Sequence, residues 1–167
     1  MAFDTFLDLG TAIPGESTAT GFEKKVEIFS FSWGASNPVT VDSAKGGISS
    51  GKVSISSFNV MKRTEASSPL LFEACCKGVH IPKITVSLRK AGGAAGQVPY
   101  LTYDFEECMV ESVQWSGSSG GDDVPTESVS FAFGKVTVEY KLQDKTGKVV
   151  AGGPKPVMWD LTKVSAT

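Results

Sequence analysis

Residues 127–142, ESVSFAFGKVTVEYKL, alternate apolar and polar side chains and change phase once. The apolar residues stand at odd positions from Val129 to Phe133 and at even positions from Val136 to Leu142. Such alternation is typical of a strand with one buried face, and a slip of one residue turns every later side chain to the other face unless a bulge absorbs it. Gly134 is therefore predicted to be a structural bulge. Bulged, bending strands are typical of a β-sandwich that closes towards a barrel.

The rest of the chain also favours short strands. Its 18 glycines and eight prolines among 167 residues indicate many turns. Further strands are expected at residues 3–9, 23–33, 52–63, 81–90, 99–108 and 109–115. Residues 34–51 are rich in Gly, Ser, Asn and Pro, which indicates a long loop. No internal repeat or second domain is apparent, so we expect one mainly β domain over residues 1–167.

One segment has a helical pattern. The stretch SSPLLFEACCKG (67–78) predicts a short α-helix over about 68–78, the only helix expected in the chain. Ser67 or Ser68 is expected at the N-cap and Pro69 at the first helical position. Gly78 is expected to end the helix in the left-handed conformation.

The stretch VEIFSFSWG (26–34) has two faces that both look partly apolar. Phe29, Phe31 and Trp33 alternate along one face, which we expect to lie in the core. The opposite face starts with two apolar side chains and ends with two hydroxyls: Val26, Ile28, Ser30 and Ser32. One interpretation is a strand that is buried on both faces at one end.

Composition excludes several classes of function. Sixteen basic and 18 acidic residues give a net charge of -2, which argues against binding to nucleic acid or to an anionic membrane surface. The N-terminal MAFDTFLDLG lacks the pattern of a signal peptide, and no apolar run approaches a membrane span. We therefore expect synthesis in the cytoplasm. The three cysteines, Cys75, Cys76 and Cys108, are expected to be core residues rather than a disulfide framework.

No catalytic, cofactor or metal site is predicted. The stretch GGISSGKV (46–53) nearly matches a phosphate-binding loop, but Val53 replaces the required hydroxyl and a strand follows in place of a helix. His80 is the only histidine, which excludes a multi-histidine metal site. The chain is not expected to be an enzyme.

Four segments, in order, resemble the haemolysin-coregulated protein (Hcp) family of the type VI secretion system. They are FLDLGTAIPGES…KKVEIFSFSWG near the start, SSPLLFEACCKG in the middle, ESVSFAFGKVTVEY near the end, and the closing MWDL (158–161). The resemblance covers nearly the whole chain. Two departures stand out: Glu65 precedes the Ser-Pro pair where many members have Asp, and the stretch from Lys145 to Pro156 is unusually rich in Gly and Pro. The path of the tail, about residues 144–167, is therefore left open.

The resemblance implies a two-sheet β-barrel with one flanking helix that assembles into hexameric rings. Stacked rings would form a tube that a contractile sheath expels, with a spike protein at the tip and small effector proteins in the lumen. The protein would then be secreted to the extracellular space or a target cell without a signal peptide.

The resemblance also gives the ambiguous segments a role. The loop at 34–51 would project along the tube and contact the adjoining ring, through Pro38, Val39, Thr40, Val41, Asp42 and Lys45. Val26 and Ile28 would be covered by a neighbouring subunit or by another element, and Ser30 and Ser32 would face the lumen or a wet seam. Two alternatives stay open: a phage-like tail-tube protein, and a β-sandwich that binds a small ligand.

Overall fold

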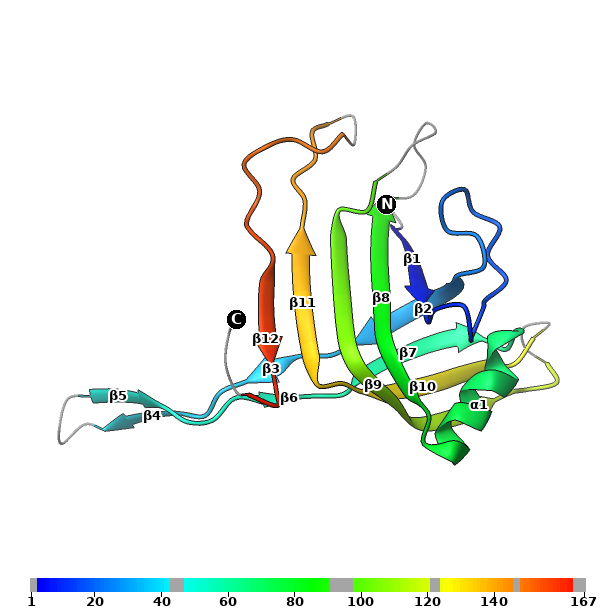
Figure 1. The fold of residues 1–167 in the computed structure, drawn as a ribbon, viewed down its shortest axis with the longest axis horizontal. Helices are drawn as coiled ribbons and strands as arrows, with labels where there is room; N and C mark the ends of the chain where they lie inside the picture. Colours follow the sequence, from blue (N-terminus) through cyan, green and yellow to red (C-terminus); the bar gives the residue numbers. More distant parts are fainter. Residues whose placement is uncertain (1–2, 43–46, 91–97, 121–123, 146–147, 164–167) are drawn as a thin grey trace.

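The computed structural model describes residues 3–42, 47–90, 98–120, 124–145 and 148–163 (Figure 1). Strands predominate, and the described residues contain a single α-helix. In chain order the elements are β1 (Phe3–Asp8), β2 (Val26–Ser32), β3 (Ala35–Ser36), β4 (Val39–Asp42), β5 (Gly47–Ser50), β6 (Ser54–Ile55), β7 (Phe58–Arg63), α1 (Ser67–Lys77), β8 (His80–Lys90), β9 (Leu101–Ser116), β10 (Thr126–Ala132), β11 (Lys135–Tyr140) and β12 (Val157–Asp160). The expected mainly β fold with one short helix is confirmed.

The main sheet closes on itself. Its strand order is β10-β7-β2-β1-β8-β9-β11-β12, and β9 also pairs with β10. The 16-residue β9 makes both contacts on one edge, because Leu101 to Glu106 pair with β11 and Met109 to Ser116 pair with β10. All of these pairings are antiparallel. The six strands β1, β2, β7, β10, β9 and β8 therefore form a barrel, and β11 and β12 extend its wall.

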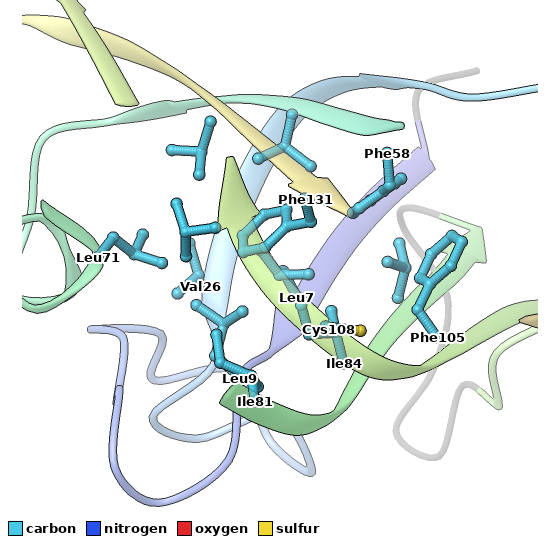
Figure 2. Close-up of a cluster of buried hydrophobic side chains, with 14 of the residues drawn as sticks. Leu7, Leu9, Val26, Phe58, Leu71, Ile81, Ile84, Phe105, Cys108 and Phe131 are labelled. Carbon is cyan, nitrogen blue, oxygen red and sulfur yellow. The ribbon is translucent and has the colours of Figure 1, made fainter. Parts of the chain in front are cut away.

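Apolar side chains from the barrel strands fill its interior (Figure 2). Leu7 of β1, Phe58 of β7, Phe105 of β9 and Phe131 of β10 are almost fully buried. Aromatic side chains stack in this interior, and the ring centroids of Phe58 and Phe105 are 4.6 Å apart. Helix α1 contributes Leu71 to the same cluster, so the helix covers part of the core rather than standing apart from it.

The ends of α1 differ in how well they match expectation. Gly78 has φ 63° and ends the helix as predicted, with the Val79 N–H donating to the Ala74 carbonyl at 3.0 Å. The predicted N-cap is wrong, because Ala66 holds that position without a side-chain hydrogen bond. Ser67 and Ser68 lie inside the first turn and are buried. The physical reason is that the Ser68 hydroxyl is occupied elsewhere, as described below.

The phase change predicted at Gly134 forms a corner shared by adjacent strands. Ala132 pairs with Met109 and Lys135 pairs with Glu106. Each strand therefore has two residues between these pairs, and the pairing register is continuous. The buried positions of β9 also change parity here, from 105 to 108, and those of β8 change from 84 to 81. Strands that bend together keep their pairing while their side chains exchange faces.

Gly134 occupies the tightest point of this corner. Its N–H donates to the carbonyls of both Glu106 (3.0 Å) and Glu107 (3.2 Å), and Glu107 has a left-handed backbone with φ 56°. A Cβ added at Gly134 would lie 3.2 Å from the Cβ of Glu107. The prediction that Gly134 is itself the bulge is wrong, because no additional residue lies between Ala132 and Lys135; the register shift falls between Ser130 and Phe131 of β10.

A bulge in β2 explains the ambiguous stretch at 26–34. The pairing with β7 shifts between Ile28 and Ser30, which leaves Phe29 as the additional residue. Val26 and Ile28, before the bulge, are buried in the core of this chain, and Phe31 and Trp33, after it, pack against the same core. The expectation that Phe29 lies in the core is wrong, because its side chain is 53% exposed.

The described part of the tail returns to the barrel. Strand β12 pairs antiparallel with β11, with Val136 opposite Trp159. The Leu161 N–H donates to the Gly134 carbonyl at 2.8 Å, which fixes the tail at the corner. Residues 164–167 lie outside the described residues.

Candidate assembly surfaces

Residues 34–42 and 47–56 form an arm that reaches away from the barrel (Figure 1). Strands β3 and β6 pair at its base, and β4 and β5 form a hairpin at its outer end. Pro38 lies where the hairpin begins, and its carbonyl accepts a hydrogen bond from the Gly51 N–H at 2.8 Å. A Cβ at Gly51 would stand only 2.7 Å from the Pro38 ring, so this close approach requires glycine.

The outer end of the arm has an exposed apolar face. Val41 pairs with Ile48, and Val39 lies two residues along the same strand, so the three side chains share one face. They are 58% (Val39), 71% (Val41) and 77% (Ile48) exposed. Thr40 lies on the opposite face and Asp42 ends β4, whereas Lys45 is outside the described residues. A two-stranded hairpin is marginal alone in water, and an exposed apolar face of this kind is typical of an interaction site.

A strip of small polar side chains crosses the outside of the barrel on β2, β7 and β10. Ser30 pairs with Met61 and Ser32 with Asn59, and both serines are exposed. The Ser130 hydroxyl donates to the Asn59 side-chain carbonyl. Of the four predicted face residues, the structure thus leaves only Ser30 and Ser32 at the surface, since Val26 and Ile28 are covered within the chain.

Two shallow grooves flank the ring of Phe29. One, of about 270 Å³, contains Arg63, whose guanidinium carbon lies 5.3 Å from the centre of the ring. The other, of about 360 Å³, contains Phe3 and Arg89. The bulge therefore places the Phe29 ring between two grooves, one lined by Arg63 of β7 and the other by Arg89 of β8.

A buried charge pair ties α1 to the barrel, and the sequence analysis missed it. The Lys62 Nζ lies 2.5 Å from Glu127 Oε1 and donates to the Ser68 hydroxyl at 3.0 Å. That hydroxyl also donates to Glu127 at 2.9 Å and accepts from the Glu65 N–H at 2.9 Å. The alternation along each strand could have revealed the pair. Lys62 continues the inward-facing positions of β7, and Glu127 continues those of β10.

Among the described residues, no group of three or more His, Cys, Asp or Glu side chains could hold a metal ion. His80 lies on the surface with its Nε2 2.5 Å from Glu107 Oε2. Within the same residues, no helix is long and apolar enough to cross a membrane.

The cysteines occupy three environments. Cys108 is fully buried, and burial raises the pKa of its thiol to about 12, with the nearby carboxylates of Glu107 and Glu106 acting in the same direction. Cys75 is half-buried and Cys76 is exposed. The expectation of a core position is therefore confirmed for Cys108 and wrong for Cys76, which lies on the outer side of α1.

Comparison with known proteins gives these surfaces a context. Residues 6–140 match the model of a family described as type VI secretion system effector, Hcp. The chain belongs to the Hcp family. Like the sequence resemblance, the match extends over most of the chain, from the first strand of the barrel to the end of β11.

Relatives of this Hcp chain agree in sequence and in fold. It is 35% identical to protein hcp1 of Pseudomonas aeruginosa over 161 residues, which cover 96% of each chain. A solved type six secretion system protein has 34% identity and a TM-score of 0.91, covering 99% of this chain and all of the other. Hcp1 from Salmonella typhimurium has 28% identity and a TM-score of 0.75, with both chains covered completely.

Proposed function

We propose that this chain is the tube subunit of a type VI secretion system. It would form homo-hexameric rings that stack into a tube, without nucleotide, metal or other cofactor. The observation that carries the proposal is the full-length match to Hcp proteins, combined with an arm whose exposed apolar face needs a partner. A tube needs a contact that repeats without closing, and a projecting arm provides one half of such a contact.

The ring and the stack would use different surfaces. A closed ring requires one patch of each subunit to meet a different patch of the next. The barrel wall provides this area, and Phe29 with its neighbouring arginines has the composition of an interface centre. The arm, from Pro38 to Ser50, would serve stacking between rings.

The polar strip that contains Ser30 and Ser32 would line the lumen or a wet seam. Small hydroxyls and the Asn59 amide present donors and acceptors without a strong charge, which suits a wall that passes varied cargo. Small effector proteins would occupy the lumen, a spike protein would lie at the tip, and a contractile sheath would surround the tube. The subunit would be made in the cytoplasm and secreted with the tube.

Replacement of residues 38–50 by a short Gly-Ser linker tests the proposed division of surfaces. Rings should persist in electron micrographs, whereas stacking and secretion should be lost. Matched double substitution of Val41 and Ile48 by Ser should give the same result without shortening the arm. Loss of the rings themselves would show that the arm belongs to the ring interface. Tubes built by the shortened protein would show that the arm is not needed for stacking.

A further inference from the structure

One carboxylate oxygen in the barrel interior has no protein partner. Glu127 Oε1 accepts hydrogen bonds from Lys62 and Ser68, whereas no described residue bonds to the second oxygen, Glu127 Oε2. The Glu127 side chain has no exposed surface, so Oε2 is not in contact with bulk water. Nearly all buried polar atoms in folded proteins are bonded to protein or to ordered water, because an unmade hydrogen bond is costly there.

The donors nearest to Glu127 Oε2 are all in use. Lys62 has three N–H groups and directs them to Glu127 Oε1, to the Ser68 hydroxyl and to the Arg63 carbonyl. Ser68 has a single O–H group, which it donates to Glu127 Oε1. Neither side chain can therefore serve Oε2 without giving up a hydrogen bond that it already makes.

A second buried polar atom without a partner lies on the same face of the sheet. Thr64 Oγ1 is shielded from solvent, and no described residue forms a hydrogen bond with it. The Thr64 N–H donates to the Pro125 carbonyl at 2.9 Å, so the pairing of β7 with β10 continues one position beyond Arg63. Because Lys62 is the direct partner of Glu127 and Thr64 follows Lys62 by two residues, Thr64 and Glu127 are diagonal neighbours on the inward-facing side.

Thr64 also lies at the edge of the barrel interior. Together with Glu65 it lines the groove of about 270 Å³ beside Phe29. This groove is open to solvent, so the surface of the protein approaches the buried charge pair at Thr64. A water molecule thus has a route to the space between the Thr64 hydroxyl and the Glu127 carboxylate.

We infer that an internal water molecule bridges the Thr64 hydroxyl and Glu127 Oε2. The water donates one hydrogen to the carboxylate oxygen and forms its second hydrogen bond with the hydroxyl, and two polar partners are enough to hold a buried water. Diagonal neighbours on paired strands have Cα atoms about 7–8 Å apart, a separation that suits two hydrogen bonds in series. The site lies within one subunit, so the inference goes beyond the proposed tube function and does not depend on it.

A crystal structure of the purified protein, at a resolution that shows ordered waters, tests the site. We expect a water within hydrogen-bonding distance of both Thr64 Oγ1 and Glu127 Oε2 in every copy of the subunit. Thr64→Val keeps the shape of the side chain and should lose this water, whereas Thr64→Ser is the matched control and should keep it. A direct hydrogen bond between Thr64 and Glu127, or a carboxylate turned so that protein donors reach both oxygens, would overturn the inference.

Urea denaturation gives an independent measurement of the same bridge. Thr64→Val should lower the urea midpoint of the otherwise unsubstituted protein, because Glu127 Oε2 then loses its bonded water. In a background that carries Lys62→Met and Glu127→Leu, the same substitution should leave the midpoint almost unchanged. Equal shifts in the two backgrounds would show that the hydroxyl is not coupled to Glu127 and would overturn the inference, while the proposed function would stand or fall on ring formation alone.

Discussion

Lys62 and Glu127 form an ion pair in the barrel interior, with 2.5 Å between Nζ and Oε1 and no exposed surface on either side chain. The two residues are also direct partners in the pairing of β7 with β10. Through the Ser68 hydroxyl, the pair binds the first turn of α1. A charge pair therefore sets the position of the helix that covers part of the apolar core.

Removal of one member of this pair should be far more harmful than removal of both. Lys62→Met leaves the Glu127 carboxylate buried without its partner, which should cost about 3–5 kcal/mol of unfolding free energy. The double variant Lys62→Met with Glu127→Leu should recover much of this loss. Urea denaturation measures both. Lys77→Met, which breaks the exposed Lys77–Glu73 pair on α1, is the control and should change little. Equal losses in the buried and exposed variants would contradict the role of the pair.

Gly134→Val should damage folding rather than only assembly. The new side chain would press on the Cβ of Glu107 and on Thr162, at the point where the strands turn together. Overpacking of this kind costs about 1–3 kcal/mol. Thermal unfolding of Gly134→Val beside Gly120→Val, where an added Cβ meets open space, isolates the effect of the corner. An unchanged melting temperature for Gly134→Val would show that the corner does not require glycine at this position.

The thiols should differ sharply in reactivity. The thiolate is the reactive form, and a pKa of about 12 combined with full burial keeps Cys108 unreactive in the native protein. Iodoacetamide at about pH 8 should modify Cys76 first and Cys108 only after unfolding. Peptide mass spectrometry of samples treated with and without urea shows the order in which the cysteines are modified. Rapid modification of Cys108 in the native protein would contradict its position in the core.

Acid should weaken the anchor between β1 and the loop before β2. Partial burial raises the pKa of Asp8, but hydrogen bonds from Lys25 and the Gly10 N–H outweigh it and lower the pKa below its usual value. The stabilisation is therefore present above the unfolded pKa and is lost as the pH falls through the lower folded value. Asp8→Asn should be less stable near neutral pH and should lose less of its stability below about pH 4. If the stability of Asp8→Asn and that of the unsubstituted protein fall in parallel as the pH is lowered, this role of Asp8 is contradicted.

Much of the fold follows from alternation in the sequence. The strands around Val129 and Phe131, the end of α1 at Gly78 and the phase change at Gly134 could all be predicted, because each depends on local backbone preferences. The bulge in β2 could not. Its additional residue is Phe29, an aromatic side chain that looks like core, whereas a glycine would have marked the irregularity. Two half-strands of opposite phase therefore look in the sequence like one strand with two apolar faces.

The candidate surfaces were harder to predict than the barrel. The valines at 39 and 41 indicated strand structure in the arm, but only the pairing of Val41 with Ile48 shows that the apolar residues share a face. The position of the tail depends on contacts between segments more than 40 residues apart, such as Gln143 with Val98. Lys62 and Glu127 were missed because charged side chains are rarely expected inside a barrel, although both follow the inward alternation of their strands.

Ring formation by this chain can be observed by negative-stain electron microscopy of the purified protein, paired with light scattering at micromolar concentration. We expect six-fold rings with a central opening and the mass of a hexamer, in buffer without nucleotide or metal. Reducing agent should leave the rings unchanged, because the proposed interfaces use no disulfide. A monomer by light scattering with no rings in the micrographs would contradict the proposed tube function and favour a β-sandwich that binds a small ligand.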